Sequence, residues 1–102
     1  MKRLINRKVY DTITAEKIAY WDNDMHGRDF GFVSETLYRT RRGAYFIHGQ
    51  GGPMTAYGVH AYGGRMAGES LKAITETEAI EWCEDRFIDP DVIAGHFSID
   101  EA

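Results

Sequence analysis

Hydrophobic and polar positions alternate most clearly over residues 30–40, where successive side chains are expected on opposite faces of one strand. Gly43 follows two arginines and can form a turn, after which the apolar run 44–48 returns as a partner strand. A further β-prone run over residues 70–74 is expected to join this hairpin. The pattern therefore predicts an antiparallel sheet at the centre of the fold.

The N-terminal segment predicts a second, smaller hairpin followed by a helix. Two short β-prone runs, 3–5 and 8–10, flank a two-residue turn. Asp11 and Thr12 then offer N-cap oxygens to a helix expected over residues 13–21. Its apolar stripe at helical spacing comprises Ala15, Ile18 and Ala19.

Two helices are expected at the C-terminal end. Thr75 and Glu78 have the spacing of a capping box, which begins a helix that runs to about Phe87. Asp89 can cap a last helix with Pro90 at its first position. The expected element order is β-β-α-β-β-β-α-α, which is an α+β fold with an antiparallel sheet of about three to five strands and helices packed on one face.

Length and composition fit one globular domain over residues 1–102, because 43% of the residues are hydrophobic and 27% are charged. No apolar run approaches the ~20 residues of a membrane-spanning helix, so we expect a cytoplasmic protein without membrane association. The one cysteine, Cys83, lies on the apolar stripe of a predicted helix and is expected in the core.

Known catalytic and metal-binding patterns are missing from the sequence. Residues 49–68 hold seven of the eleven glycines, and we expect a bend followed by a mobile loop there. The glycine spacing fits neither a P-loop nor a dinucleotide-binding turn. The four histidines and Cys83 have no metal-ligand spacing, and no motif supplies a nucleophile. We therefore expect no enzyme, no metal and no cofactor.

The net charge of −4 hides an asymmetry between the two halves of the chain. Residues 1–48 contain nine Lys/Arg and six Asp/Glu, whereas residues 49–102 contain three and ten. Nine of these ten acids lie within 76–101, against the single base Arg86. Such a segment would attract a basic protein surface, although solvated helix faces also carry such charge. The candidate partner-binding acidic strip comprises Glu76, Glu81, Glu84, Asp85, Asp89 and Asp91.

The tip of the central hairpin offers an alternative site. Basic side chains interleaved with aromatic ones can hold single-stranded nucleic acid by phosphate contact and base stacking. The acidic balance of the domain argues against this use. The same arginines could instead pair with the acidic half, either within one chain or across a homodimer. The candidate residues are Tyr38, Arg39, Arg41, Arg42 and Tyr45.

Four segments carry a recognisable pattern, namely residues 4–15 (LINRKVYDTITA), 35–43 (ETLYRTRRG), 46–52 (FIHGQGG) and 75–82 (TETEAIEW). They resemble a family of small proteins encoded by bacterial phages and conjugative elements. The resemblance covers most of the chain except residues 57–69, which are richer in glycine here. Similar small domains include inhibitors of CRISPR effectors, so the resemblance implies an anti-CRISPR-like protein that acts in a bacterial host cell.

The charge pattern and the resemblance together predict a non-enzymatic, protein-binding inhibitor. CRISPR effectors hold nucleic acid in positively charged channels. An acidic helical surface could occupy such a channel, which makes an effector subunit the expected protein partner. A small nucleic-acid-binding regulator remains the alternative, and both a monomer and a homodimer are open.

Overall fold

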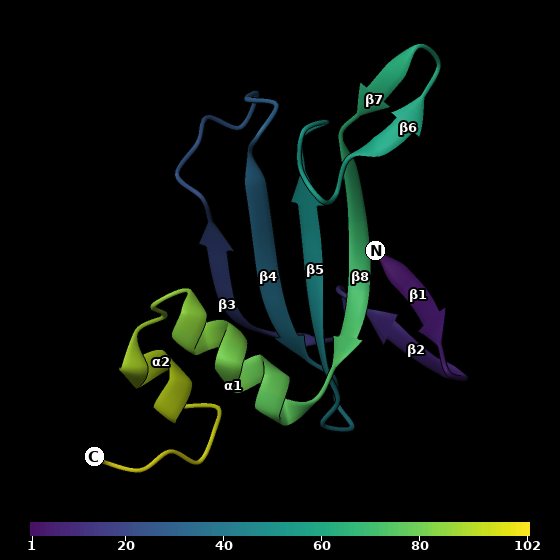
Figure 1. The fold of residues 1–102 in the computed structure, drawn as a ribbon. Helices are drawn as coiled ribbons and strands as arrows, with labels where there is room; N and C mark the ends of the chain where they lie inside the picture. The colour runs from purple at the N-terminus through teal and green to yellow at the C-terminus, as the bar shows by residue number, and fades with distance from the viewer.

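The computed structural model describes residues 1–102 and shows an α+β fold of eight strands and two helices (Figure 1). The elements are β1 (Lys2–Ile5), β2 (Lys8–Asp11), β3 (Glu16–Asp22), β4 (Val33–Arg39), β5 (Tyr45–Gly51), β6 (Val59–Ala61), β7 (Gly64–Met66), β8 (Gly68–Ile74), α1 (Glu76–Asp85) and α2 (Pro90–Ala94). The predicted fold class is confirmed, and both helices lie at the C-terminal end of the chain. With ten and five residues, they are too short to cross a membrane.

The centre of the fold is a four-stranded antiparallel sheet in the order β3-β4-β5-β8. The predicted central hairpin is confirmed as β4 and β5, and β8 joins it along β5 as expected. In the register of this hairpin, Glu35 lies opposite Gly49. The strand β5 runs through Gly49 and Gly51, so the bend that we expected to begin at residue 49 is wrong.

The helix predicted over residues 13–21 is also wrong, because this segment contains the edge strand β3 (Glu16–Asp22). The Asp11 carboxylate accepts a hydrogen bond from the backbone N–H of Ile13 at 2.9 Å in a turn, rather than capping a helix. Ile18 is left out of the register with β4 by a β-bulge. The extra residue breaks the period of two, so the apolar positions mimic helical spacing.

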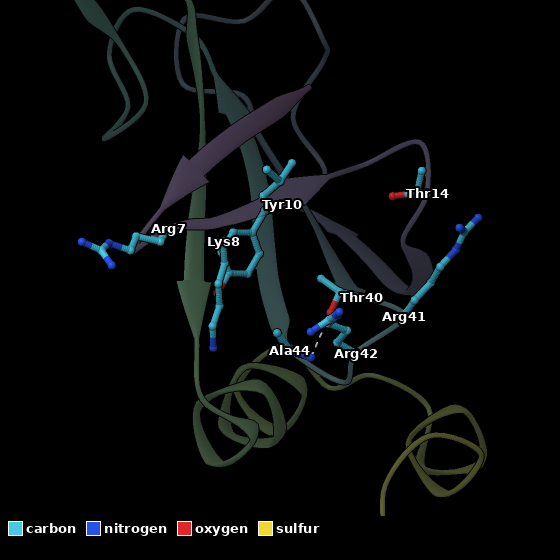
Figure 2. A pocket seen from close by; sticks show the side chains of 9 residues that line it. Arg7, Lys8, Tyr10, Thr14, Thr40, Arg41, Arg42 and Ala44 are labelled. Carbon is cyan, nitrogen blue, oxygen red and sulfur yellow. Dashed lines mark hydrogen bonds between the residues drawn. The ribbon is translucent and has the colours of Figure 1, made fainter.

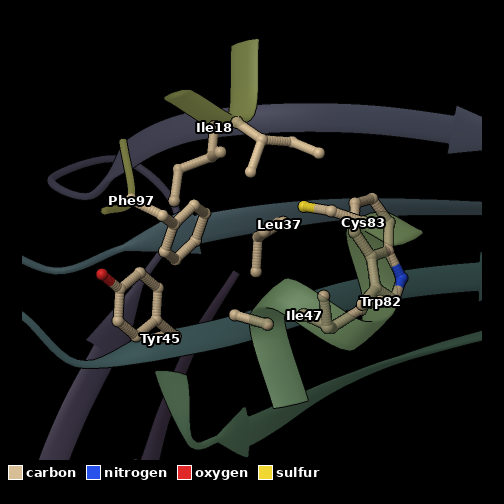
Figure 3. Close-up of a cluster of buried hydrophobic side chains, with 9 residues drawn as sticks. Ile18, Leu37, Tyr45, Ile47, Trp82, Cys83 and Phe97 are labelled. Atoms are coloured by element: carbon tan, nitrogen blue, oxygen red, sulfur yellow. The ribbon is translucent and has the colours of Figure 1, made fainter. Parts of the chain in front are cut away.

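Hydrophobic cores lie on both faces of the central sheet. The helices cover one face, as predicted, and the β1–β2 hairpin covers the other. Neighbouring residues of β5 alternate between the two cores. Tyr45 and Ile47 belong to the helix-side core (Figure 3), whereas Phe46 belongs to the hairpin-side core. The helix-side core contains Ile18, Leu37, Tyr45, Ile47, Ala79, Trp82, Cys83, Ile93 and Phe97. The hairpin-side core contains Tyr10, Tyr38, Phe46 and Leu71.

Candidate functional site

A buried carboxylate ties three parts of the chain together on the helix side of the sheet. The Glu35 side chain on β4 is only 12% exposed. Its Oε1 accepts hydrogen bonds from Arg86 Nε at 2.8 Å and from Trp82 Nε1 at 3.0 Å, while Oε2 accepts one from the Tyr57 hydroxyl. The Arg86 guanidinium also lies 2.6 Å from Oε1 through its second nitrogen. Glu35 therefore fixes both the end of α1 and the loop that carries Tyr57.

Arg86 is held by aromatic rings as well as by charge. Its guanidinium carbon lies 4.9 Å from the ring centroid of Trp21 and 5.0 Å from that of Trp82. Such cation–π contacts strengthen when the site is shielded from water. The single base of the acidic C-terminal segment is thus paired with Glu35 and leaves the acids of that segment unneutralised.

The glycine-rich motif at the end of β5 makes this arrangement possible. Tyr57 reaches Glu35 by crossing Gly49, and a Cβ on Gly49 would lie 2.1 Å from the Tyr57 ring. A Cβ on Gly51 would lie 2.3 Å from Oγ1 of Thr55. Both glycines therefore allow close approach of the following loop, which gives the motif a packing role.

The environment of Glu35 decides its charge. Burial alone would raise the pKa of Glu35, but hydrogen bonds from Tyr57 and Trp82 and the charge of Arg86 outweigh it and hold this pKa below its ordinary value. Burial and the neighbouring Glu35 raise the pKa of Tyr57, which keeps its hydroxyl protonated as a donor. Glu35 and its three partners Tyr57, Trp82 and Arg86 hold the segments together, and we call these four residues the clamp.

Neither a reactive cysteine nor a metal site is found elsewhere. Burial raises the pKa of the Cys83 thiol in the core. No three His, Cys, Asp or Glu side chains gather where they could hold a metal ion.

The lowered pKa of Glu35 predicts acid sensitivity. The unfolded chain takes up a proton at Glu35 near pH ~4.3, the ordinary range of a glutamate, before the folded protein does. The free energy of unfolding should therefore fall as the pH drops below this value and through the lower, folded pKa. Urea denaturation between pH 3 and 7 (about the range in which carboxylates titrate) should show a shallower pH slope for Glu35→Gln than for the parent. Parallel slopes would contradict this assignment.

An acidic groove of about 340 Å³ lies beside this clamp, between α1 and the edge strand β8. Its lining carries three carboxylates from α1, those of Glu78, Glu81 and Asp85. Lys72 and the ion-paired Glu35 and Arg86 are the other charged residues on the lining. Trp82 contributes an apolar wall. The sequence pattern predicts Glu78 only as part of the capping box, where its carboxylate accepts the Thr75 N–H at 3.0 Å. Its place on the groove follows from its spacing to Glu81 and Asp85, which puts all three on one face of the helix.

All six residues of the predicted acidic strip are exposed, and none forms an ion pair. The strip is not continuous, however. Glu76 and Asp85 are nine positions apart, about two and a half turns, so they lie on opposite sides of α1. Asp89 caps α2, and its carboxylate accepts the Asp91 N–H at 2.9 Å. The compact part of the strip is therefore the α1 face formed by Glu81, Glu84 and Asp85, which we call the acidic face.

The predicted nucleic-acid site at the hairpin tip needs a correction. Tyr38 and Tyr45 are only 9% and 7% exposed and belong to cores on opposite faces of the sheet, so neither can stack on a base. Arg39, Arg41 and Arg42 are exposed and form no ion pair, so they do not pair with the acidic half of the same chain.

Arg41 and Arg42 also share a cavity with residues that are far away in the sequence. They line one cavity together with Arg7 and Lys8 from the β1–β2 turn, while Arg39 does not (Figure 2). The molecule thus presents an acidic face on α1 and a basic cavity between two hairpin turns. Comparison of the chain with models of protein families, with curated proteins and with solved structures finds no match in any of the three.

Proposed function

We propose that this protein is a non-enzymatic binding module that applies the acidic face of α1 to a basic surface of a partner protein, as an anti-CRISPR-like inhibitor in a bacterial host. One observation carries the proposal: the carboxylates of Glu81, Glu84 and Asp85 are exposed together and have no partner within the chain. Carboxylates grouped in this way create a negative electrostatic potential that attracts a cationic protein surface.

The groove beside the acidic face has the dimensions and chemistry to receive a long cationic side chain. Its volume of about 340 Å³ is near the lower end of ligand-pocket volumes. An arginine entering it would place its guanidinium between the carboxylates of Glu81 and Asp85. A bidentate guanidinium–carboxylate contact would add geometric specificity to the charge attraction.

The acidic face is also held in place before a partner arrives. The capping box orders the first turn of α1, Ala79 and Cys83 anchor its middle in the core, and Trp82 and Arg86 fix its end to Glu35. A preformed surface loses less conformational entropy on binding than a flexible one.

A nucleic-acid channel of a CRISPR effector is the partner surface that we favour. Such channels are lined by cationic side chains that contact a nucleic-acid backbone. The segmental resemblance to small proteins of mobile elements points in the same direction. Charge attraction would speed the encounter, so association should slow markedly as salt concentration rises.

Charge reversal on the acidic face tests this function. The double variant Glu81→Lys/Asp85→Lys should lower partner affinity by on the order of 100-fold, because each former attraction becomes a repulsion. The matched control Asp100→Lys/Glu101→Lys makes the same charge change outside the groove and should bind like the parent. Affinity would be measured by capture of proteins from bacterial lysate, and inhibition by cleavage of target DNA with purified CRISPR effectors.

The two variants separate local charge from overall charge. Circular dichroism should show that both keep the parent fold, since all four positions are exposed. Equal capture and equal inhibition by the parent and by Glu81→Lys/Asp85→Lys would overturn the proposed function. Equal losses in both double variants would show that net charge alone matters and would overturn the role of the groove.

A further inference from the structure

The basic cavity lies between two turns that are far apart in the sequence. It has a volume of about 630 Å³. The β1–β2 turn contributes Arg7 and Lys8, and the β4–β5 turn contributes Arg41 and Arg42 (Figure 2). Figure 2 shows Lys8 and Arg42 toward the middle of the cavity, while the side chains of Arg7 and Arg41 extend outward on opposite sides of it.

The charge of this cavity is uncompensated. No acidic residue lines it, and none of its four cations takes part in an ion pair of the molecule. Like charges brought together in a concave surface raise the local concentration of ions of opposite sign. The cavity therefore favours an anion.

Both turns are held in defined positions. The β1–β2 turn has Asn6 and Arg7 at φ values of 50° and 67°, the left-handed geometry of a tight two-residue hairpin turn. In the β4–β5 turn, Gly43 has a φ of 87°, and its N–H donates to the Thr40 carbonyl at 2.9 Å. The first hairpin is tied to the sheet by Arg3, which donates to the Leu71 carbonyl at 2.7 Å. The backbone positions that carry the four cations are thus fixed before a ligand binds.

We propose that this cavity binds the phosphate groups of a polyphosphate chain or of a nucleic-acid backbone. Guanidinium groups match phosphate oxygens with paired hydrogen bonds, and an ammonium group adds a point charge. Two threonines on the lining, Thr14 and Thr40, supply hydroxyl groups. The Thr40 hydroxyl oxygen accepts the Ala44 N–H at 3.0 Å, which leaves its own proton available to a phosphate oxygen.

The cavity recognises phosphate rather than bases. The only aromatic side chain on its lining, Tyr10, is buried against Phe46 with ring centroids 5.6 Å apart, so its faces are not open to stacking. Tyr38 and Tyr45 are in the cores. The volume of about 630 Å³ accommodates more than one phosphate group. This site is independent of the acidic face, so it stands whether or not the proposed function does.

Titration calorimetry at low ionic strength, with inorganic triphosphate and with a thymidine oligonucleotide as separate probes, tests the site. Lys8→Ala and Arg42→Ala should each weaken binding of the preferred probe by about tenfold, the effect of losing one charge-assisted contact. The control Arg28→Ala removes an exposed cation that lies outside the cavity and should bind like the parent.

The outcomes distinguish the two phosphate sources. Tighter binding of triphosphate, lost in the cavity variants only, identifies a free polyphosphate ligand. Tighter binding of the oligonucleotide, lost in the same variants, identifies a nucleic-acid backbone, and binding should then show little preference between thymidine and adenine sequences. The proposal is overturned if neither probe binds, or if Arg28→Ala weakens binding as much as Lys8→Ala and Arg42→Ala do.

Discussion

Replacing Glu35 with leucine is expected to lower the free energy of unfolding by about 3 kcal/mol, because it removes one partner of a partly buried ion pair and strands the other. Arg86 would keep its charge in a partly buried position, and the Trp82 and Tyr57 donors would lose their acceptor. The measurement is urea denaturation at neutral pH. Glu84→Leu, at an exposed and unpaired acid, is the matched control and should change stability by less than about 0.5 kcal/mol.

A double-mutant cycle measures the interaction energy between Glu35 and Arg86 separately from their contacts with other residues. Arg86→Met alone should also be destabilising, since it leaves the Glu35 carboxylate without its countercharge and removes the cation between the two tryptophans. The double variant should be less destabilised than the sum of the two single changes, because neither charge is then left alone. Effects that add to within about 0.5 kcal/mol would show that the two side chains do not act as a pair.

The contacts of Glu35 that stabilise the fold also position the acidic face. Glu35 holds Trp82 and Arg86 at the C-terminal end of α1, and Asp85 lies between these two residues in the chain. Loss of the clamp would let this end of the helix fray and would spread the carboxylates that face the groove. The acidic face therefore depends on a residue from β4 that does not belong to it.

Local signals explain which elements could be predicted. The capping box is confirmed in full, since the Thr75 hydroxyl accepts the Glu78 N–H at 3.1 Å and the Glu78 carboxylate accepts the Thr75 N–H at 3.0 Å. The last helix begins at Pro90 after the cap Asp89, as predicted. Both signals lie within a few residues of the helix start, so a single sequence contains all that is needed.

The features that escaped prediction depend on contacts between distant segments. The β3 segment is a strand because its backbone pairs with β4, although its apolar residues have helical spacing. The β-bulge in β3 interrupts the alternation of apolar and polar residues that is typical of a strand. The partners of Glu35 lie 22, 47 and 51 positions away along the chain. Gly49 was a partial signal, because a glycine within a strand often marks the close approach of another segment.

The sequence shows which residues are charged, but it predicts only part of their arrangement in space. The i, i+3 and i+4 spacing of Glu81, Glu84 and Asp85 indicates one helix face, which the structure places away from the core. The basic cavity carried no such signal, since Arg7 and Arg42 belong to different hairpins. The two turns line one cavity only because the β1–β2 hairpin packs on the face of the sheet opposite the helices.

Phe46→Ala should therefore damage both the fold and the basic cavity. Phe46 is fully buried, stacks on Tyr38 with ring centroids 4.9 Å apart and meets the edge of Tyr10 from β2. Truncating a buried phenylalanine costs about 3–5 kcal/mol through lost burial and the cavity left behind. Because Tyr10 loses its aromatic contact with Phe46, the hairpin should detach more readily, and the amides of β2 should exchange hydrogen faster than those of β5.

The same truncation at an exposed site provides the control. Phe30 is 66% exposed, and Phe30→Ala should change stability by less than about 0.5 kcal/mol. Binding of triphosphate or oligonucleotide should weaken in Phe46→Ala under conditions in which the variant is still folded, because Arg7 and Lys8 would no longer be held opposite Arg41 and Arg42. Unchanged exchange at β2 together with unchanged phosphate binding would show that the hairpin is positioned without Phe46, and that the two turns do not depend on this core for their alignment.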